Sequence, residues 1–289
     1  MNNTKTSFAD KWNNNPDLAF TETLRVGSDI YNWILTRNGF KNSEELSSFL
    51  SAKSRILDAG CGNGRVTALL RKYSNQSANV VGIDLVAHEV AKKNLEGAVN
   101  TNFFQKDLLS DLSDLGKFDF IYCQEVLHHT NNPKAAFLNL VTLLDNKGEI
   151  AIYVYKKKAP VREFVDDFIR EKIAPLNYEE AMKVCEQITQ LGKTLSEIKG
   201  KVVIPQVDVL EIKGGEYDIQ RFLYHFFMKC FWNPDLSMEQ NVAINYDWYH
   251  PQNCTRHTMA EILDWYKEAG LNVSHQFEDF YGITVRGSK

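Results

Sequence analysis

The sequence lacks several features that would assign a protein to a common class at once. Its five cysteines are scattered and none has C-x-x-C spacing, which argues against a metal site. Lys and Arg number 33 against 37 Asp and Glu, so the basic excess usual in nucleic-acid-binding proteins is missing. No apolar run is long enough to span a bilayer, and the first residues lack the apolar core of a signal peptide. We therefore expect no metal, no membrane and no nucleic acid, and the odd number of cysteines suits the reducing cytoplasm.

What is present is a regular alternation of strand and helix patterns in a chain of 289 residues, 44% of them hydrophobic. The alternation predicts an α/β fold with a Rossmann-like, mostly parallel seven-stranded sheet and helices on both faces. Expected strands are 54–58, 79–84, 101–105, 118–123, 148–155, 271–276 and 280–286, and expected helices of the core are 64–74, 88–97, 133–144 and 258–269. A helical N-terminal segment (1–50) precedes the core (51–155 and 256–289), and a helix-rich insertion (156–255) follows the fifth strand.

The most informative segment is I-L-D-A-G-C-G-N-G, residues 56–64. A buried strand, a glycine-rich turn and a helix in this order are typical of a nucleotide-binding corner. The carboxylate of Asp58 would repel a dinucleotide pyrophosphate, whereas it suits the ammonium group of S-adenosylmethionine (SAM). The third glycine of the dinucleotide fingerprint is also replaced by Arg65. The segment therefore favours SAM over NAD.

A second acid supports this interpretation. Asp84 closes the expected strand 79–84, where a carboxylate can accept hydrogen bonds from both ribose hydroxyls of an adenosyl group. The alternative is that Asp84 caps the following helix. Its spacing from Asp58 and the glycines favours the cofactor role.

These segments together resemble the class I SAM-dependent methyltransferases. D-A-G-C-G-N-G, V-V-G-I-D, Q-K-D (ending at Asp107) and F-D-F-I-Y-C-Q-E-V-L-H-H-T are similar to the family's four motifs, and the resemblance covers about 53–155 and 257–289. It implies SAM as cofactor, S-adenosyl-L-homocysteine (SAH) as product, and an acid at the adenine amino group. The implied cofactor-binding residues are Asp58, Gly60, Cys61, Gly62, Gly64, Asp84, Leu85, Asp107, Leu108 and Gln124. Fold and cofactor do not identify the methyl acceptor.

The insertion, 156–255, is predicted to form a lid and substrate pocket, because ligands of such sheets bind at the carboxyl ends of the strands. An oligomerisation element, as in a homodimer, is the alternative, and the two roles are compatible. We expect the segment N-Y-D-W-Y-H-P to be a loop that carries substrate-binding aromatic rings. The predicted substrate-binding residues are Tyr153, Tyr246, Trp248, Tyr249 and Arg256, the last for a carboxylate or phosphate.

One helix of the insertion, expected at 160–173, carries charges at helical spacing. Arg162 and Asp166 are i,i+4 partners, as are Asp166 and Arg170. We expect a ladder of ion pairs on the surface. If the helix instead faces a pocket, Arg162 or Asp166 becomes a substrate ligand.

An oxygen or nitrogen nucleophile must lose a proton as it attacks the methyl group, and histidine is suited to accept it. The candidate catalytic bases are His128, His129, His250 and His257. Glu125, Tyr153 and Tyr155 are further options.

The sequence thus predicts a cytoplasmic SAM-dependent methyltransferase that acts on an O or N atom of a small molecule, by in-line displacement in a covered pocket. Three alternatives stay open: a macromolecular (protein or RNA) methyltransferase, a catalytically inactive SAM-binding partner subunit, and, more remotely, an NAD-dependent oxidoreductase.

Overall fold

The computed structural model describes residues 3–289, which form two compact units. The core unit comprises residues 12–156 and 255–289. The insertion unit comprises residues 157–254 together with the N-terminal residues up to Lys11. The first helix, α1 (Thr4–Asn14), contributes to both units, because the division falls between Lys11 and Trp12.

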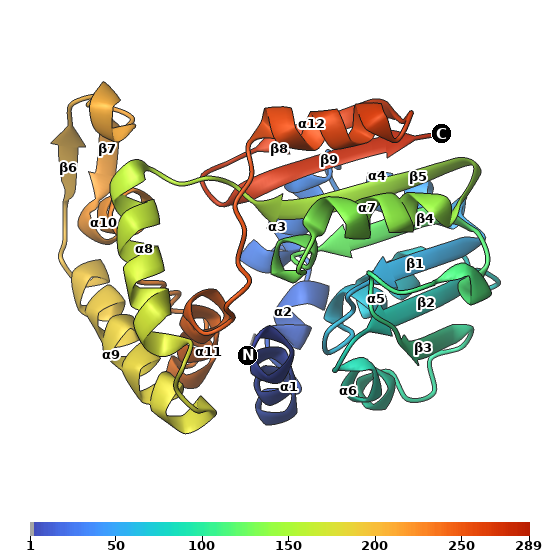
Figure 1. Cartoon of the computed structure of the whole chain (residues 1–289), viewed down its shortest axis with the longest axis horizontal. Coiled ribbons are helices and arrows are strands. Elements are labelled where there is room, and N and C mark those ends of the chain that lie inside the picture. The colour runs from blue at the N-terminus through green and yellow to red at the C-terminus, as the bar shows by residue number, and fades with distance from the viewer. Residues whose placement is uncertain (1–2) are drawn as a thin grey trace. The chain divides into compact units, whose positions relative to one another are not determined.

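The core unit contains a seven-stranded sheet of order β3-β2-β1-β4-β5-β9-β8 (Figure 1). Its strands are β1 (Arg55–Ala59), β2 (Asn79–Asp84), β3 (Thr101–Gln105), β4 (Phe118–Gln124), β5 (Leu144–Tyr155), β8 (Asn272–Glu278) and β9 (Gly282–Ser288). The pairs among β1 to β5 are parallel, and β9 runs antiparallel to both β5 and β8. The predicted mostly parallel, seven-stranded Rossmann-like sheet is confirmed. Its strand order reverses between β1 and β4, which is where such sheets bind ligands.

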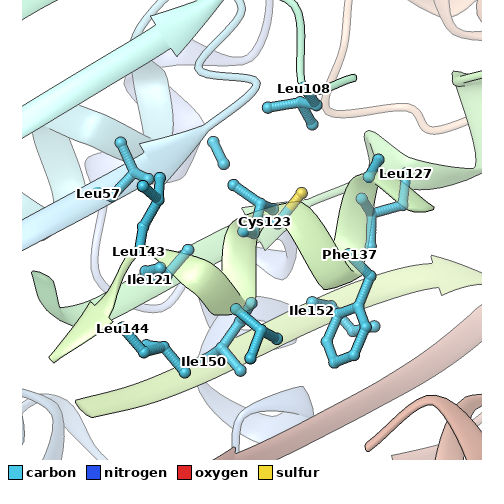
Figure 2. Packing of buried hydrophobic residues seen from close by; sticks show 14 of the residues in the cluster. Leu57, Leu108, Ile121, Cys123, Leu127, Phe137, Leu143, Leu144, Ile150 and Ile152 are labelled. Carbon is cyan, nitrogen blue, oxygen red and sulfur yellow. The ribbon is translucent and has the colours of Figure 1, made fainter. Parts of the chain in front are cut away.

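Helices cover both faces of this sheet. They are α2 (Phe20–Leu24), α3 (Asp29–Arg37), α4 (Ser43–Ser51), α5 (Arg65–Tyr73), α6 (His88–Asn94), α7 (Pro133–Thr142) and α12 (Met259–Glu268), with 3-10 turns at Ser113–Leu115 and Leu127–His129. Neighbouring residues of β1 point to opposite faces, as the pleat of a strand requires. Leu57 packs with α7 and α12 around Phe137 (Figure 2), and Ile56 packs with α3, α4 and α5. Both faces of the sheet are therefore buried, as expected for parallel strands.

The fifth strand was expected at 148–155, but β5 begins at Leu144, and the N-K-G sequence at 146–148 lies inside it as a bulge. Leu144 pairs with Phe118, and the next pair joins Glu149 to Phe120. Lys147 takes a left-handed conformation, with φ of 63°. A bulge lets a strand bend without ending, and local turn signals do not distinguish the two outcomes.

The insertion unit consists of helices and a small hairpin. Its elements are α8 (Pro160–Ile173), α9 (Tyr178–Ser196), β6 (Lys201–Ile204), a 3-10 turn (Asp208–Leu210), β7 (Gly215–Asp218), α10 (Ile219–Phe226) and α11 (Met238–Tyr249). The residues before Trp12 join it through side-chain contacts. Asn3 Nδ2 donates to the carbonyls of Ala174 and His250, and Lys11 pairs with Asp247 at 2.8 Å.

The loop expected at N-Y-D-W-Y-H-P is wrong. Its residues up to Tyr249 are the last turns of α11, whose start at Ser237 is fixed by a capping box. Two asparagines allow this polar segment to be buried. Asn245 exchanges two hydrogen bonds with the backbone of Phe231, and the Asn241 side chain accepts from the backbone N–H of Asn233.

The surface ladder on α8 is also wrong. Arg162 does pair with Asp166, at 3.1 Å, but both side chains are only 1% exposed. Arg170 pairs with Asp167 rather than with Asp166. The Arg162–Asp166 pair can be buried because residues of other elements donate hydrogen bonds to Asp166, which local spacing does not predict.

Candidate functional site

The glycine turn after β1 is held against the end of β2. The N–H groups of Gly60 and Cys61 both donate to the carbonyl of Ile83, at 2.7 and 2.9 Å. Gly60 has φ of +86°, and a Cβ there would lie 2.3 Å from the Val126 side chain. Only glycine satisfies both conditions, so the turn is a fixed feature of the sheet edge.

Asp58 lies immediately before this turn and is buried. Its Oδ2 accepts a hydrogen bond from the Thr67 hydroxyl at 2.6 Å. Burial raises the pKa of Asp58 to about 7, against the opposing effects of the Thr67 hydrogen bond and the positive charge of Arg65. A buried carboxyl with a raised pKa at a sheet edge is typical of a functional site, because a cationic ligand would restore its charge.

Asp84 connects the glycine turn to the segment after β2. Its Oδ2 accepts from Gly62 N at 3.0 Å, and its Oδ1 accepts from Val86 N and Ala87 N, both at 2.9 Å. It is not the cap residue of α6, because that position belongs to Ala87. Asp84 therefore organises the turn, and its half-buried carboxylate closes the strand as expected.

The remaining predicted cofactor residues also lie where strands β2 to β4 end. Leu85 follows β2, and its carbonyl accepts from Gln105 Nε2. Asp107 is exposed after β3 and accepts from Leu109 N, while the Leu108 side chain is buried in the core (Figure 2). Gln124 ends β4 and accepts a hydrogen bond from the Tyr122 hydroxyl. The structure thus brings the predicted cofactor-binding residues to one edge of the sheet, the edge at which its parallel strands have their carboxyl ends.

Two residues that the sequence did not indicate, Asn63 and Arg65, connect this part of the sheet to the segment at 16–23. Asn63 Nδ2 donates to the carbonyls of Pro16 and Leu18, at 3.1 and 3.0 Å. Arg65 donates to Thr23 Oγ1 at 3.0 Å and pairs with Glu125 at 3.1 Å. An arginine at the start of a helix is usually exposed, so the sequence did not indicate that Arg65 makes these contacts.

Three of the four candidate bases gather at the end of β5. His128 stacks on Tyr155 with ring centroids 3.7 Å apart, and His129 packs against both rings. The carbonyl of His128 accepts from Thr255 N, whose hydroxyl lies 3.0 Å from His257 Nε2. His128 Nδ1 accepts from Tyr155 N at 3.3 Å, so its proton belongs on Nε2.

The fourth candidate, His250, belongs to the insertion unit. Its Nδ1 lies 2.9 Å from Ser7 Oγ, and its Nε2 lies 3.0 Å from the carbonyl of Leu176. Burial lowers the pKa of this imidazole. Both ring nitrogens are therefore engaged in contacts within the unit.

The predicted substrate residues are divided between the units. Tyr153 is buried in β5, under the guanidinium of Arg37 at 4.6 Å from its ring centroid. Arg256 is half-buried in the segment before α12. Tyr246, Trp248 and Tyr249 are all buried in α11 of the insertion unit.

Residues 3–289 show no feature of a metal site or of a membrane span. Within this range no group of three or more His, Cys, Asp or Glu side chains is placed to hold a metal ion. Nor does any helix in it have the length and apolar character needed to cross a membrane.

Comparison with known proteins gives a family. Residues 50–207, more than half of the chain, match the family described as "Methyltransferase domain". The chain is 26% identical over 212 residues to a protein named ubiquinone biosynthesis O-methyltransferase from Rickettsia canadensis, covering 70% of this chain and 78% of that one. It is 36% identical over 118 residues to an uncharacterized Synechococcus protein, of whose length it spans only 28%.

A solved structure gives a similar fold. PKMT2 from Rickettsia typhi, in complex with AdoHcy, matches with a TM-score of 0.52 and 15% identity, covering 84% of this chain and 51% of that chain. At this identity the likeness concerns the fold alone.

Proposed function

The chain belongs to the methyltransferase domain family, and from this premise we propose that it transfers a methyl group from SAM to an O or N atom of a small molecule. The observation that carries the proposal is the edge formed by Asp58, the glycine turn and Asp84 at the point where the strand order reverses. Each part has a complementary group on SAM, and none of the three requires a phosphate.

In this proposal Asp58 binds the ammonium group of the methionine end. The glycine turn lets the backbone approach the ligand closely, and the carboxylate of Asp84 accepts from the ribose hydroxyls while it keeps its bond to Gly62 N. Asp107 binds the adenine amino group. SAM supplies the electrophilic methyl group, so the protein must align the nucleophile and exclude water.

The acceptor's proton is taken by His129 or His257 of the cluster at the end of β5, because His128 uses Nδ1 as an acceptor and carries its proton on Nε2. We leave His250 out of this set, since both its ring nitrogens have partners within the insertion unit. The insertion unit, with its buried aromatic side chains, supplies the acceptor-binding residues. The relative named as a ubiquinone biosynthesis O-methyltransferase supports an oxygen acceptor. The five free, buried thiols suit the reducing cytoplasm.

The first test is calorimetric titration of SAM and SAH into the wild-type chain and Asp84→Asn. We expect binding in the micromolar range and at least a fivefold loss in the variant, which is about 1 kcal/mol. The matched control is Asp114→Asn, because that carboxylate is 64% exposed and pairs only with Lys106 among the described residues. Absence of SAM and SAH binding by the wild type would overturn the proposal, whereas equal binding by all three chains would remove Asp84 from the cofactor site.

A further inference from the structure

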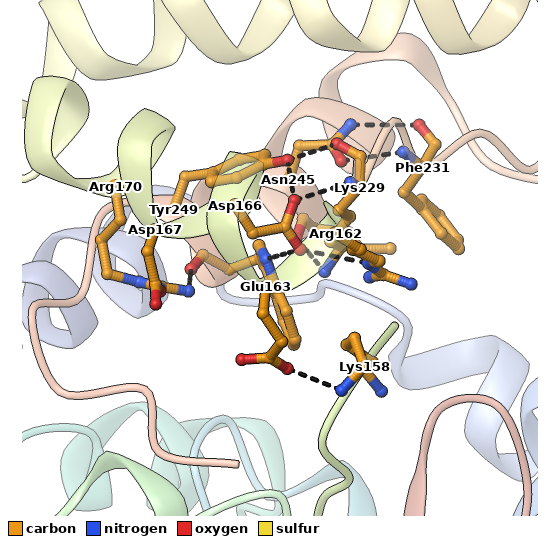
Figure 3. A network of polar contacts seen from close by, with 12 residues as sticks. Lys158, Arg162, Glu163, Asp166, Asp167, Arg170, Lys229, Phe231, Asn245 and Tyr249 are labelled. Carbon is orange, nitrogen blue, oxygen red and sulfur yellow. Dashed lines mark hydrogen bonds and ion pairs between the residues drawn. The ribbon is translucent and has the colours of Figure 1, made fainter. Parts of the chain in front are cut away.

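The insertion unit contains a buried carboxylate whose hydrogen-bonding capacity is filled. Asp166 Oδ2 accepts from Arg162 Nε and Trp248 Nε1, at 3.1 and 2.9 Å (Figure 3). Its Oδ1 accepts from the Tyr249 hydroxyl and Lys229 N, at 2.8 and 2.9 Å. With two hydrogen bonds at each oxygen, this carboxylate has no capacity left for other cations.

Positive charge nevertheless exceeds negative charge in this interior. The buried cationic side chains of the described unit are Lys11, Lys158, Arg162, Arg170 and Lys229, whereas Asp166 is its single buried carboxylate. Half-buried or exposed acids compensate two of these cations, since Asp247 pairs with Lys11 and Asp167 with Arg170. A buried N–H donor of such a cation is costly to leave without a hydrogen-bond acceptor.

Two arginines of the unit lie next to the ring of Tyr224. The guanidinium of Arg162 lies 4.6 Å from its centroid and that of Arg221 lies 5.5 Å from it. The Nη1 atoms of both arginines are buried and have no hydrogen-bond partner among the described residues. Arg162 is only 1% exposed, so water does not replace the missing partner. Two arginine donors therefore stay available next to one aromatic ring.

The pKa of a neighbouring side chain, His225, is affected by the same positive charges. Burial lowers the pKa of His225 to about 3, and the positive charges of Arg162, Arg221 and Lys158 lower it further in the same direction. These three cations come from α8, α10 and the segment before α8. Cations from three parts of the chain thus act on one place.

We propose that Arg162 and Arg221 form an oxyanion-binding site in the insertion unit, and that it binds a carboxylate or phosphate group of the methyl acceptor. Guanidinium groups match the planar geometry of these oxyanions and form short, charge-assisted hydrogen bonds with them. A bound anion would supply the missing acceptors for the Nη1 atoms of both arginines. The inference rests on the proposed function, because only that function makes the ligand a methyl acceptor.

The test uses the full chain and three small probes: benzoate, phenyl phosphate and the neutral benzamide. We expect one of the anions to bind at least about tenfold more tightly than benzamide. The anion that binds more tightly identifies the group, carboxylate or phosphate. Arg162 is unsuitable for substitution because it holds Asp166, so the variant is Arg221→Gln, with an expected loss of at least about tenfold.

Two further variants make the test specific. Arg221→Lys keeps the positive charge but lacks the planar N–H donors of the guanidinium group. We expect its affinity for the anion to lie between those of the wild type and Arg221→Gln. Lys199→Gln removes a positive charge from an exposed position of the same unit and should leave anion binding unchanged. Equal binding of benzoate, phenyl phosphate and benzamide, or full anion affinity in Arg221→Gln, would overturn the proposal.

SAH titrations on the same preparations separate the two proposals. SAH binding without selective anion binding would remove the oxyanion site and leave the methyltransferase function. Selective anion binding without SAH binding would overturn the methyltransferase function and leave an anion site whose ligand is not a methyl acceptor.

Discussion

The Thr67 hydroxyl donates a hydrogen bond to the buried carboxylate of Asp58, linking the first turn of α5 to the end of β1 across the glycine turn. This bond favours the ionised form of Asp58, whereas burial favours the neutral form and prevails. The site without a ligand therefore holds a carboxyl group that changes its charge near neutral pH.

The first prediction concerns SAH binding as a function of pH. Burial raises the pKa of Asp58 to about 7, so below pH 7 the carboxyl must lose its proton before it pairs with the ligand's ammonium group. The dissociation constant should fall as pH rises from about 5 to 7, by up to about tenfold per pH unit, and then level off. Calorimetry at several pH values measures this.

Two variants serve as controls for that experiment. Asp58→Asn should bind SAH weakly with no such pH dependence. Thr67→Val removes the hydrogen bond that favours ionisation, so the curve should shift to higher pH. A wild-type affinity that is constant between pH 5 and 8 would contradict the role of Asp58.

A second prediction compares two glycines with the same backbone conformation. Gly60 and Gly97 have φ of +86° and +81°, but a Cβ at Gly60 would meet Val126 at 2.3 Å, whereas a Cβ at Gly97 would meet nothing within 4 Å. Gly97→Ala should cost about 1–2 kcal/mol of unfolding free energy from its left-handed conformation. Gly60→Ala should cost about 1–3 kcal/mol more, because of overpacking. Chemical denaturation measures both, and equal losses would show that Val126 moves freely.

A third prediction compares neighbouring acids on α8. Asp166→Ala leaves the buried Arg162 without its counter-ion and should lower the unfolding free energy by about 3–5 kcal/mol. Asp167→Ala removes a pair whose acid is 51% exposed and should cost less than about 1 kcal/mol. Urea denaturation of the two variants tests the difference. Similar small losses would mean that Asp166 contributes no more than a surface charge.

A fourth prediction concerns stability in acid. Burial lowers the pKa of His225 to about 3, below its ordinary value of about 6.5. The unfolded chain then binds more protons than the folded one, so stability should fall as pH drops from about 6.5 toward 3. His225→Asn should lose less of its unfolding free energy over that range, measured by denaturation at each pH. A slope unchanged by the substitution would assign the acid sensitivity to other groups.

Local sequence patterns predicted the core unit well, because its strands are short apolar runs bounded by turns. They placed β1 to β4 and α12 to within one or two residues. They failed where burial depends on distant partners. Asp166 accepts hydrogen bonds from Trp248 and Tyr249, 82 and 83 residues further along the chain, and no spacing within α8 indicates this. Asn245 is buried in α11 for the same reason, since its side-chain amide forms hydrogen bonds with the backbone N–H and carbonyl of Phe231.

The cofactor edge was predictable in its residues but not in its internal bonds. The motif identifies Asp84 and Gly62, which lie 22 residues apart and are hydrogen-bonded. It does not indicate that Asp84 also holds Val86 and Ala87, or that Asn63 binds the segment before it. Such contacts depend on the path of the backbone after each strand, which a residue pattern leaves undetermined.

The N-terminal contacts of the insertion unit also determine when that unit can be completed during synthesis. The two acceptors of Asn3 lie 171 and 247 residues further along the chain. Asn3 is therefore synthesised long before these partners and must wait for them. Contacts of such long sequence separation form slowly. We expect the core unit's early strands to pair first and the N-terminal helix to dock among the last steps of folding.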